Sequence, residues 1–169
     1  MVLTVANTAV ATAAAIVRIG ARPVFVDVDP ERLTMDPVHL VAVIDALAPQ
    51  RPKAIIPVHL YGQPADMPAI VSIAAENGMA VVEDCAQAHG ARIDGRRVGS
   101  WGQAGCFSTY PTKNLGGVGD GGMITTHNGR LAEKLRRIRE YGWHERYISR
   151  TPGTNSRLDE LQAAVLRVK

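Results

Sequence analysis

Residues 54–84 read AIIPVHLYGQPADMPAIVSIAAENGMAVVED, and this stretch decides the fold class. An apolar run over 54–58 precedes a helical pattern that starts at Asp66 and stops at Gly78, and a second apolar run covers 79–82. Both runs are apolar on both faces, which is typical of parallel strands covered by helices on either side of the sheet. The stretch therefore predicts a strand–helix–strand unit of an α/β protein.

The same alternation of strand and helix patterns continues on both sides of this unit. Further strands are expected over 2–5, 24–28, 105–109 and 123–126, a small hairpin over 91–98, and helices over 8–19, from Asp36-Pro37 onwards, over 129–141 and over 157–169. Residues 142–156 read as a polar loop, and the apolar stripe of the last helix predicts packing in the core or against another domain. The expected architecture is a three-layer α/β/α domain with a mostly parallel sheet.

The composition is that of a soluble globular protein. The 169 residues suffice for one domain with its own core, and 46% are hydrophobic and 21% charged. The net charge is +3, and a basic cluster over 134–139 shares its predicted helix with an apolar face. We interpret that cluster as a solvated helix face rather than a nucleic-acid site, because aromatic residues make up only 5% of the chain.

The cysteines and histidines show no metal-binding spacing. Cys85 and Cys106 form no CxxC pair, and no HExxH pattern occurs, so we predict a reduced, cytoplasmic protein without a metal. The N-terminus lacks the basic region of a signal peptide. No apolar run reaches the roughly 18 residues that a membrane span needs, so no membrane contact is predicted.

Residues 106–116 read CFSTYPTKNLG and place Lys113 in a loop between two expected strands. Most lysines are surface charges, but these strands hold Lys113 near the sheet, and the glycines that follow allow another molecule to approach the backbone. The glycines over 117–122 match GxGxxG, yet a strand pattern follows where a dinucleotide site needs a helix. We interpret them as a turn, and Lys113 as a candidate Schiff-base nucleophile.

Residues 81–90 read VVEDCAQAHG and place Asp84 at the carboxyl end of a buried strand. Open α/β sheets hold their ligand-binding groups at this edge. A carboxylate there can simply cap the next turn. Together with Lys113, however, it suggests a counter-ion for a protonated ring nitrogen.

At these two segments the chain resembles the DegT/DnrJ/EryC1/StrS family, the sugar aminotransferases. The resemblance extends along nearly the whole chain, with linked motifs over 6–8, 23–29, 57–62, 83–90, 107–116, 119–122 and 155–159. It implies the large domain of an aspartate-aminotransferase-like enzyme that depends on pyridoxal 5'-phosphate (PLP). Residues 1–169 would be the central part of that domain, a fragment without the family's N-terminal segment and C-terminal small domain.

The resemblance also implies a role for individual residues. Lys113 would form a Schiff base with PLP, and Asp84 would pair with the pyridinium nitrogen. Gln87 would lie near the ring and its phenolic oxygen, and Ser108 would bind the phosphate. Asn155 would reach the phosphate of the neighbouring subunit in a homodimer.

The implied reaction moves an amino group from glutamate or glutamine to a nucleotide-linked keto sugar, as in polysaccharide or antibiotic sugar biosynthesis. A related branch of the family dehydrates sugars and has histidine at the lysine position, so Lys113 favours the aminotransferase. Many members carry a ring-stacking aromatic residue where this chain has Ala9. Two alternatives stay open: a truncated, non-catalytic remnant that serves as a binding or dimerisation module, and a related PLP enzyme such as aminohydroxybenzoate synthase.

Overall fold

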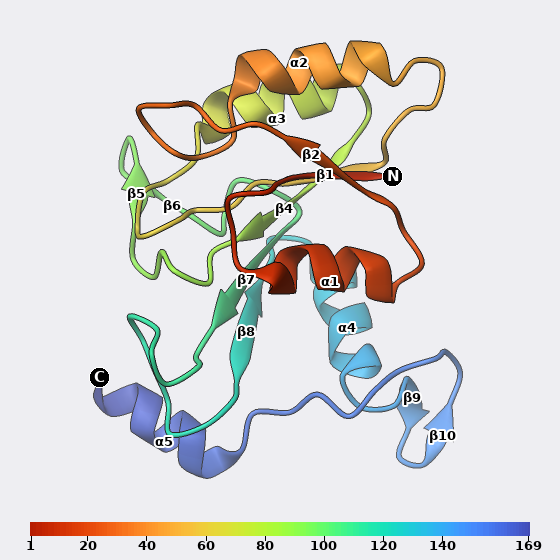
Figure 1. Ribbon diagram of the computed structural model, residues 1–169. Helices are drawn as coiled ribbons and strands as arrows, with labels where there is room; N and C mark the ends of the chain where they lie inside the picture. Colours follow the sequence, from red (N-terminus) through yellow and green to blue (C-terminus); the bar gives the residue numbers. More distant parts are fainter.

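A six-stranded sheet forms the centre of the molecule in the computed structural model, which describes residues 1–169 (Figure 1). Its strands lie in the order β2-β1-β3-β4-β7-β8, with the bounds β1 Val2–Val5, β2 Pro23–Val26, β3 Ala54–Ile56, β4 Ala80–Asp84, β7 Ala104–Ser108 and β8 Gly122–Thr125. Neighbouring strands are parallel except for β8, which runs antiparallel to β7. The predicted mostly parallel sheet is confirmed.

Helices cover both faces of this sheet, as predicted. They are α1 Val10–Arg18, α2 Pro37–Ala46, α3 Met67–Glu76, α4 Gly129–Ile138 and α5 Glu160–Val168. In Figure 1, α2 and α3 lie together on one face of the sheet, and α1 lies on the opposite face. None of these helices is long and apolar enough to cross a lipid bilayer.

Local sequence signals explain where α2 and α3 begin. The side chain of Asp36 accepts a hydrogen bond from the Val38 amide at 2.8 Å, and that of Asp66 accepts one from the Ala69 amide at 3.2 Å. A proline occupies the first or second position of each helix, where no intrahelical donor is needed. Both helix starts are therefore encoded by short aspartate–proline segments.

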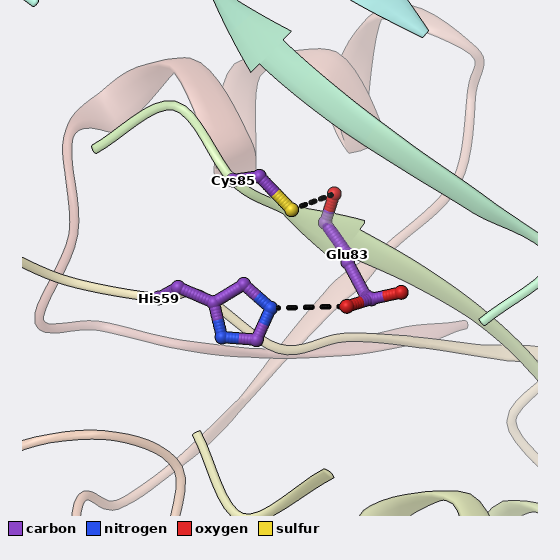
Figure 2. Close-up of side chains that lie close together, drawn as sticks. All are labelled: His59, Glu83 and Cys85. Atoms are coloured by element: carbon purple, nitrogen blue, oxygen red, sulfur yellow. Dashed lines mark hydrogen bonds and ion pairs between the residues drawn. The ribbon is translucent and has the colours of Figure 1, made fainter. Parts of the chain in front are cut away.

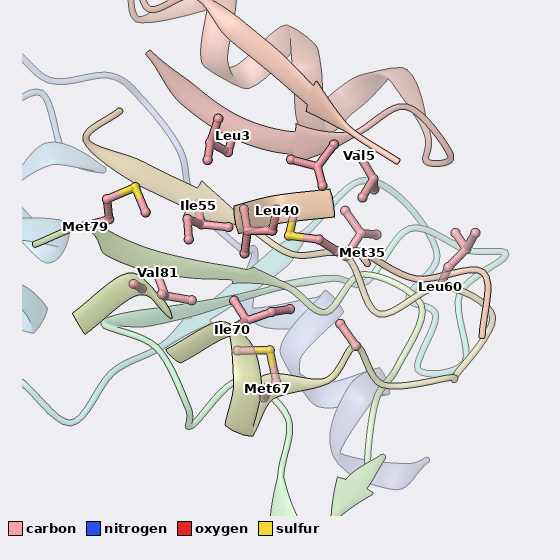
Figure 3. Packing of buried hydrophobic residues seen from close by; sticks show 14 residues of the cluster. Leu3, Val5, Met35, Leu40, Ile55, Leu60, Met67, Ile70, Met79 and Val81 are labelled. Atoms are coloured by element: carbon pink, nitrogen blue, oxygen red, sulfur yellow. The ribbon is translucent and has the colours of Figure 1, made fainter. Parts of the chain in front are cut away.

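The main hydrophobic core lies between the sheet and the α2–α3 layer (Figure 3). Leu3, Ile55 and Val81 come from three adjacent strands, and Leu40 and Ile70 come from the two helices. All five side chains are almost completely buried. This packing holds β1, β3 and β4 side by side, so that their carboxyl ends meet at one edge of the sheet.

Residues 142–156 are not the irregular loop that the sequence predicts. They contain a small antiparallel hairpin formed by β9 Trp143–Glu145 and β10 Ile148–Ser149. The Trp143 ring contacts the rings of Tyr141 and Tyr147, with centroid distances of 5.5 and 5.4 Å. Strands of two or three residues are too short to show an alternating pattern, which is why the prediction was wrong here. The predicted hairpin over 91–98 is confirmed as β5 Arg92–Ile93 and β6 Arg96–Arg97.

The last helix differs from its prediction in both length and burial. It begins at Glu160 rather than at residue 157, and Leu161 and Val168 of its apolar stripe are 81% and 89% exposed. A polar contact joins this helix to the loop before β8 instead, because the side chain of Gln162 accepts a hydrogen bond from the Val118 amide at 2.8 Å. The prediction of core packing is therefore wrong, whereas packing against another domain stays a prediction.

Candidate active site

A cavity of about 380 Å³ opens at the carboxyl edge of the sheet. The ends of β4 and β7 contribute Asp84 and Ser108 to its wall, and the loops that follow these strands contribute Gln87 and Lys113. The structure thus brings together four of the five predicted site residues. Ala9, at the start of α1, also lines the cavity and presents only a methyl group there.

Asp84 is held by hydrogen bonds to its backbone and to its side chain. Its amide donates to the Pro57 carbonyl at 2.9 Å, and its carbonyl accepts from the His59 amide at 3.0 Å. One carboxylate oxygen, Oδ1, accepts from the Ala86 amide at 3.1 Å, and the other, Oδ2, accepts from the Thr12 hydroxyl at 2.7 Å. These donors fix the direction of the carboxylate.

Sequence reasoning missed Thr12. This residue lies on α1, far from Asp84 in the sequence, and its side chain is 5% exposed. Thr8 lies just before α1, which begins at Val10 rather than at the predicted residue 8, and its hydroxyl lies 3.1 Å from the Thr12 hydroxyl. Two threonines four residues apart in the alanine-rich segment after β1 were the available signal.

Lys113 lies in a tightly folded loop between β7 and β8. Its amide donates to the Tyr110 carbonyl at 2.8 Å, and the Gly117 amide donates to the Thr109 carbonyl at 2.8 Å. A Cβ atom at Gly116 would collide with the carbonyl oxygen of Pro111, so the close approach of the loop to itself requires glycine. The predicted glycine turn between two strands is confirmed, and it leaves Lys113 half-buried on the wall of the cavity.

Ser108 and Gln87 each keep hydrogen-bond donors for a ligand. The Ser108 hydroxyl oxygen accepts from the Tyr110 amide at 3.2 Å, so its own proton has no partner within the chain. The Gln87 Oε1 atom accepts from the Tyr61 amide at 3.0 Å, which leaves the Nε2 protons as donors. An amine, a carboxylate, a hydroxyl and an amide donor match the aldehyde, the ring nitrogen, the phosphate and the phenolic oxygen of PLP. The residues present therefore fit this cofactor.

His89 lies close enough to Lys113 for their charges to interact. Burial lowers the pKa of His89, and the nearby positive charge of Lys113 lowers it further. The net shift is downward, which favours a neutral imidazole. Its ring packs at a tilt against Phe107, with a centroid distance of 5.4 Å.

Asn155 is not part of this cavity. It is exposed and pairs with Glu140 in an isolated antiparallel bridge beside the β9–β10 hairpin. Within one chain, the structure does not bring Asn155 together with the other four residues. Its role in a neighbouring subunit stays a prediction.

Glu83, His59 and Cys85 form a buried cluster on the other side of β4 (Figure 2). The His59 Nε2 atom lies 3.2 Å from Glu83 Oε2, and His59 Nδ1 accepts from the Ala65 amide at 3.0 Å. The Glu83 carboxylate accepts further bonds of 2.7 to 2.8 Å from three backbone amides, those of Gly99, Trp101 and Gly102. Its four lone-pair positions are thus occupied.

Two opposing effects act on the pKa of Glu83. Burial raises it, but the hydrogen bonds from His59, Gly102 and Gly99 together outweigh burial, and the pKa lies below its ordinary value. Burial raises the pKa of the Cys85 thiol, and the nearby carboxylates raise it further. A protonated thiol beside a carboxylate without free lone pairs is a poor metal ligand set. We interpret the cluster as a structural hydrogen-bond network.

The fold and the cavity define an α/β domain with a cavity at the carboxyl edge of its sheet, lined by a lysine and a carboxylate. The chain belongs to the DegT/DnrJ/EryC1/StrS aminotransferase family, whose sequence pattern matches residues 1–169. The resemblance noted in the sequence motifs is confirmed.

Individual relatives agree with this membership. The chain is 54% identical over 169 residues to dTDP-3-amino-3,4,6-trideoxy-alpha-D-glucose transaminase of Micromonospora megalomicea subsp. nigra, covering 99% of this chain and 44% of the relative. It is 52% identical to UDP-N-acetyl-3-dehydro-alpha-D-glucosamine 3-aminotransferase of Acidithiobacillus ferrooxidans, covering 96% and 43%. The crystal structure of a DegT DnrJ EryC1 StrS aminotransferase from Brucella abortus superposes with a TM-score of 0.95 at 41% identity, covering 99% and 46%. The chain thus spans less than half the length of the curated relatives it matches.

Proposed function

We propose that this chain is the central part of the large domain of a PLP-dependent aminotransferase. The enzyme would move an amino group from glutamate or glutamine to a nucleotide-linked keto sugar. The observation that carries the proposal is the convergence of Lys113, Asp84, Ser108 and Gln87 on one cavity at the carboxyl edge of the sheet. The family membership and the sugar substrates in the relatives' names support it.

Each residue at the cavity has a chemical task in this proposal. The Asp84 carboxylate would hold a positively charged ring nitrogen, and the Ser108 hydroxyl would donate to the phosphate. The Gln87 amide would donate to the phenolic oxygen. When bound, PLP supplies an aldehyde that captures amines and a ring that withdraws electrons from the adjacent carbon.

Lys113 would perform two tasks at its Nζ atom. It would bind the cofactor covalently in the resting enzyme and leave when the donor amine arrives. The free, neutral amine would then take a proton from the α-carbon of the donor and deliver it to the cofactor. A half-buried position in a loop suits both tasks. The loop keeps the Lys113 backbone beside the sheet and leaves the side chain able to move.

The proposal extends to parts of the enzyme outside one chain of 169 residues. A homodimer would let Asn155 of one subunit reach the phosphate in the other. The relatives' greater length is consistent with residues 1–169 being part of a larger domain. The cytoplasmic location predicted from Cys85 and Cys106 stays a prediction.

Covalent capture of the cofactor tests the proposal. The purified chain is mixed with PLP and reduced with borohydride, and the modified peptide is located by mass spectrometry. We expect a single adduct on the peptide that contains Lys113, and its loss in Lys113→Ala. Lys134→Ala is the matched control, because this exposed lysine lies on α4, outside the cavity.

Other outcomes separate the alternatives. Scattered labelling of surface lysines would contradict a formed cofactor site and favour a non-catalytic binding or dimerisation module. A specific adduct at Lys113 without amine transfer to any nucleotide-linked keto sugar would direct the work to related PLP reactions, aminohydroxybenzoate synthesis among them.

A further inference from the structure

Thr12 of α1 and Thr8, which lies just before this helix, connect the cavity to the far side of the Asp84 carboxylate. The Thr12 hydroxyl donates to Asp84 Oδ2 at 2.7 Å, and the Thr8 hydroxyl lies 3.1 Å from the Thr12 hydroxyl. Thr8 lines the cavity, whereas Thr12 lies beneath it with 5% of its surface exposed. The hydroxyls therefore form a short chain from the cavity wall to the carboxylate.

The number of protons available decides which group is the donor in each of these hydrogen bonds. An ionised carboxylate only accepts hydrogen bonds, so Thr12 must donate its single proton to Asp84. The Thr12 oxygen can then only accept from Thr8, and Thr8 must be the donor of that pair. Both hydroxyls therefore point their protons towards Asp84.

We propose that Thr12, supported by Thr8, is a positioning residue that keeps the Asp84 carboxylate turned towards the ring nitrogen of the cofactor. The proposal rests on the proposed function for the identity of the ligand. Without Thr12, only the Ala86 amide would orient the carboxylate, through Oδ1. The Asp84 side chain would then be free to rotate away from the position that a ring nitrogen requires.

The chain offers closely matched variants for the test. Thr12→Val keeps the side-chain shape and removes the hydroxyl, and Thr12→Ser keeps the hydroxyl. Thr34→Val is the control, because Thr34 is 2% exposed and its hydroxyl has no hydrogen-bond partner. It makes the same chemical change at a buried site without breaking a bond.

The first measurement needs no cofactor. We expect the Ala86 amide to exchange its hydrogen roughly tenfold faster in Thr12→Val, because its acceptor on Asp84 becomes mobile. Thr12→Ser and Thr34→Val are expected to exchange at the wild-type rate. Unchanged exchange in Thr12→Val would overturn the proposal whether or not the chain binds PLP.

The second measurement compares PLP with its 1-deaza analogue, in which a C–H group replaces the ring nitrogen. We expect Thr12→Val to weaken PLP binding roughly tenfold, since charge-assisted hydrogen bonds have about that effect, and to leave the affinity for the analogue unchanged within about twofold. Thr12→Ser should restore the affinity for PLP. Equal weakening of both ligands would overturn the proposal, because it would show a general packing effect. Failure of the wild-type chain to bind either ligand would instead contradict the proposed function, and amide exchange would still decide the role of Thr12.

Discussion

Glu83 and Asp84 are consecutive carboxylates with different environments. Successive residues of a strand point to opposite faces of the sheet, so Glu83 enters the buried network with His59, and Asp84 faces α1 and the cavity. Glu83 accepts three backbone amides and Asp84 accepts only one. The first carboxylate is suited to holding protein segments together, and the second keeps capacity for a ligand.

Replacing Ser108 with alanine tests the phosphate contact. We expect Ser108→Ala to weaken PLP binding roughly tenfold, because one charge-assisted hydrogen bond to the phosphate is lost. Pyridoxal, which lacks the phosphate, should bind wild type and variant equally. Thr112→Ala removes an exposed hydroxyl from the same loop and serves as the control. Equal weakening of PLP and pyridoxal would contradict a phosphate contact at Ser108.

At the scale of elements, the Glu83 network joins three segments at the end of β4. It links β4 to His59, which follows β3, and to the turn over 99–102, which precedes β7. The turn and β7 approach so closely that a Cβ atom at Gly105 would collide with the backbone of Gly99. The network thus holds the end of β4, which carries Asp84, against His59 and the turn that leads into β7.

This network makes acid stability depend on Glu83. Its pKa in the folded chain lies below the ordinary 4.5, so the unfolded chain binds more protons as the pH falls below that value. The stabilisation is complete above about pH 4.5 and is lost as the pH falls through the folded pKa. Urea unfolding between pH 3 and pH 7 measures it. Glu83→Gln should unfold about 3 kcal/mol more easily at neutral pH and lose less stability on acidification.

A matched substitution separates this effect from general acid sensitivity. Glu145→Gln removes an exposed carboxylate that makes no side-chain hydrogen bond, so its pH profile should follow the wild type. If Glu83→Gln kept the full wild-type loss of stability at low pH, the assigned origin of that loss would be wrong.

At the scale of the whole molecule, the separation of Asn155 from the cavity predicts sites shared between subunits. Equal amounts of Lys113→Ala and Asn155→Ala are mixed and allowed to exchange subunits. In each mixed dimer, one site would then combine an intact Lys113 with an intact Asn155. Random exchange should restore roughly a quarter of the sites, measured as adduct on the Lys113 peptide at a PLP concentration that leaves Asn155→Ala mostly unlabelled.

Two substitutions within one cavity provide the control for this mixing experiment. Lys113 and Ser108 lie on the same cavity wall of one chain, so mixing Lys113→Ala with Ser108→Ala should restore no site. Two outcomes would show that Asn155 does not act across a subunit boundary. One is a chain that sediments as a monomer, and the other is a mixture of Lys113→Ala and Asn155→Ala that restores no more sites than the control mixture.

The sequence by itself determined the class of sheet, the order of its elements and the edge where the site lies. Apolar runs, aspartate–proline helix starts and glycine turns are local signals, and parallel strands place their carboxyl ends together. For this reason Asp84 and Lys113 could be named from the pattern, whereas Gln87 and Ser108 were implied only by the family resemblance; all four are found on one cavity. Element bounds were less accurate, because helices and strands end where packing stops; α4 ends at Ile138 rather than at 141.

Only the tertiary structure decided which distant side chains meet. The Thr12 hydroxyl and the Asp84 carboxylate are 72 residues apart, and their contact depends on α1 crossing the face of the sheet opposite α2 and α3 (Figure 1). The exposure of α5 also depends on what surrounds it. An apolar stripe indicates that a helix face tends to be buried, but it does not identify what covers that face. Hydrogen bonds between remote segments depend both on the order of the strands and on the position of the helices. No local stretch of the sequence specifies either of these.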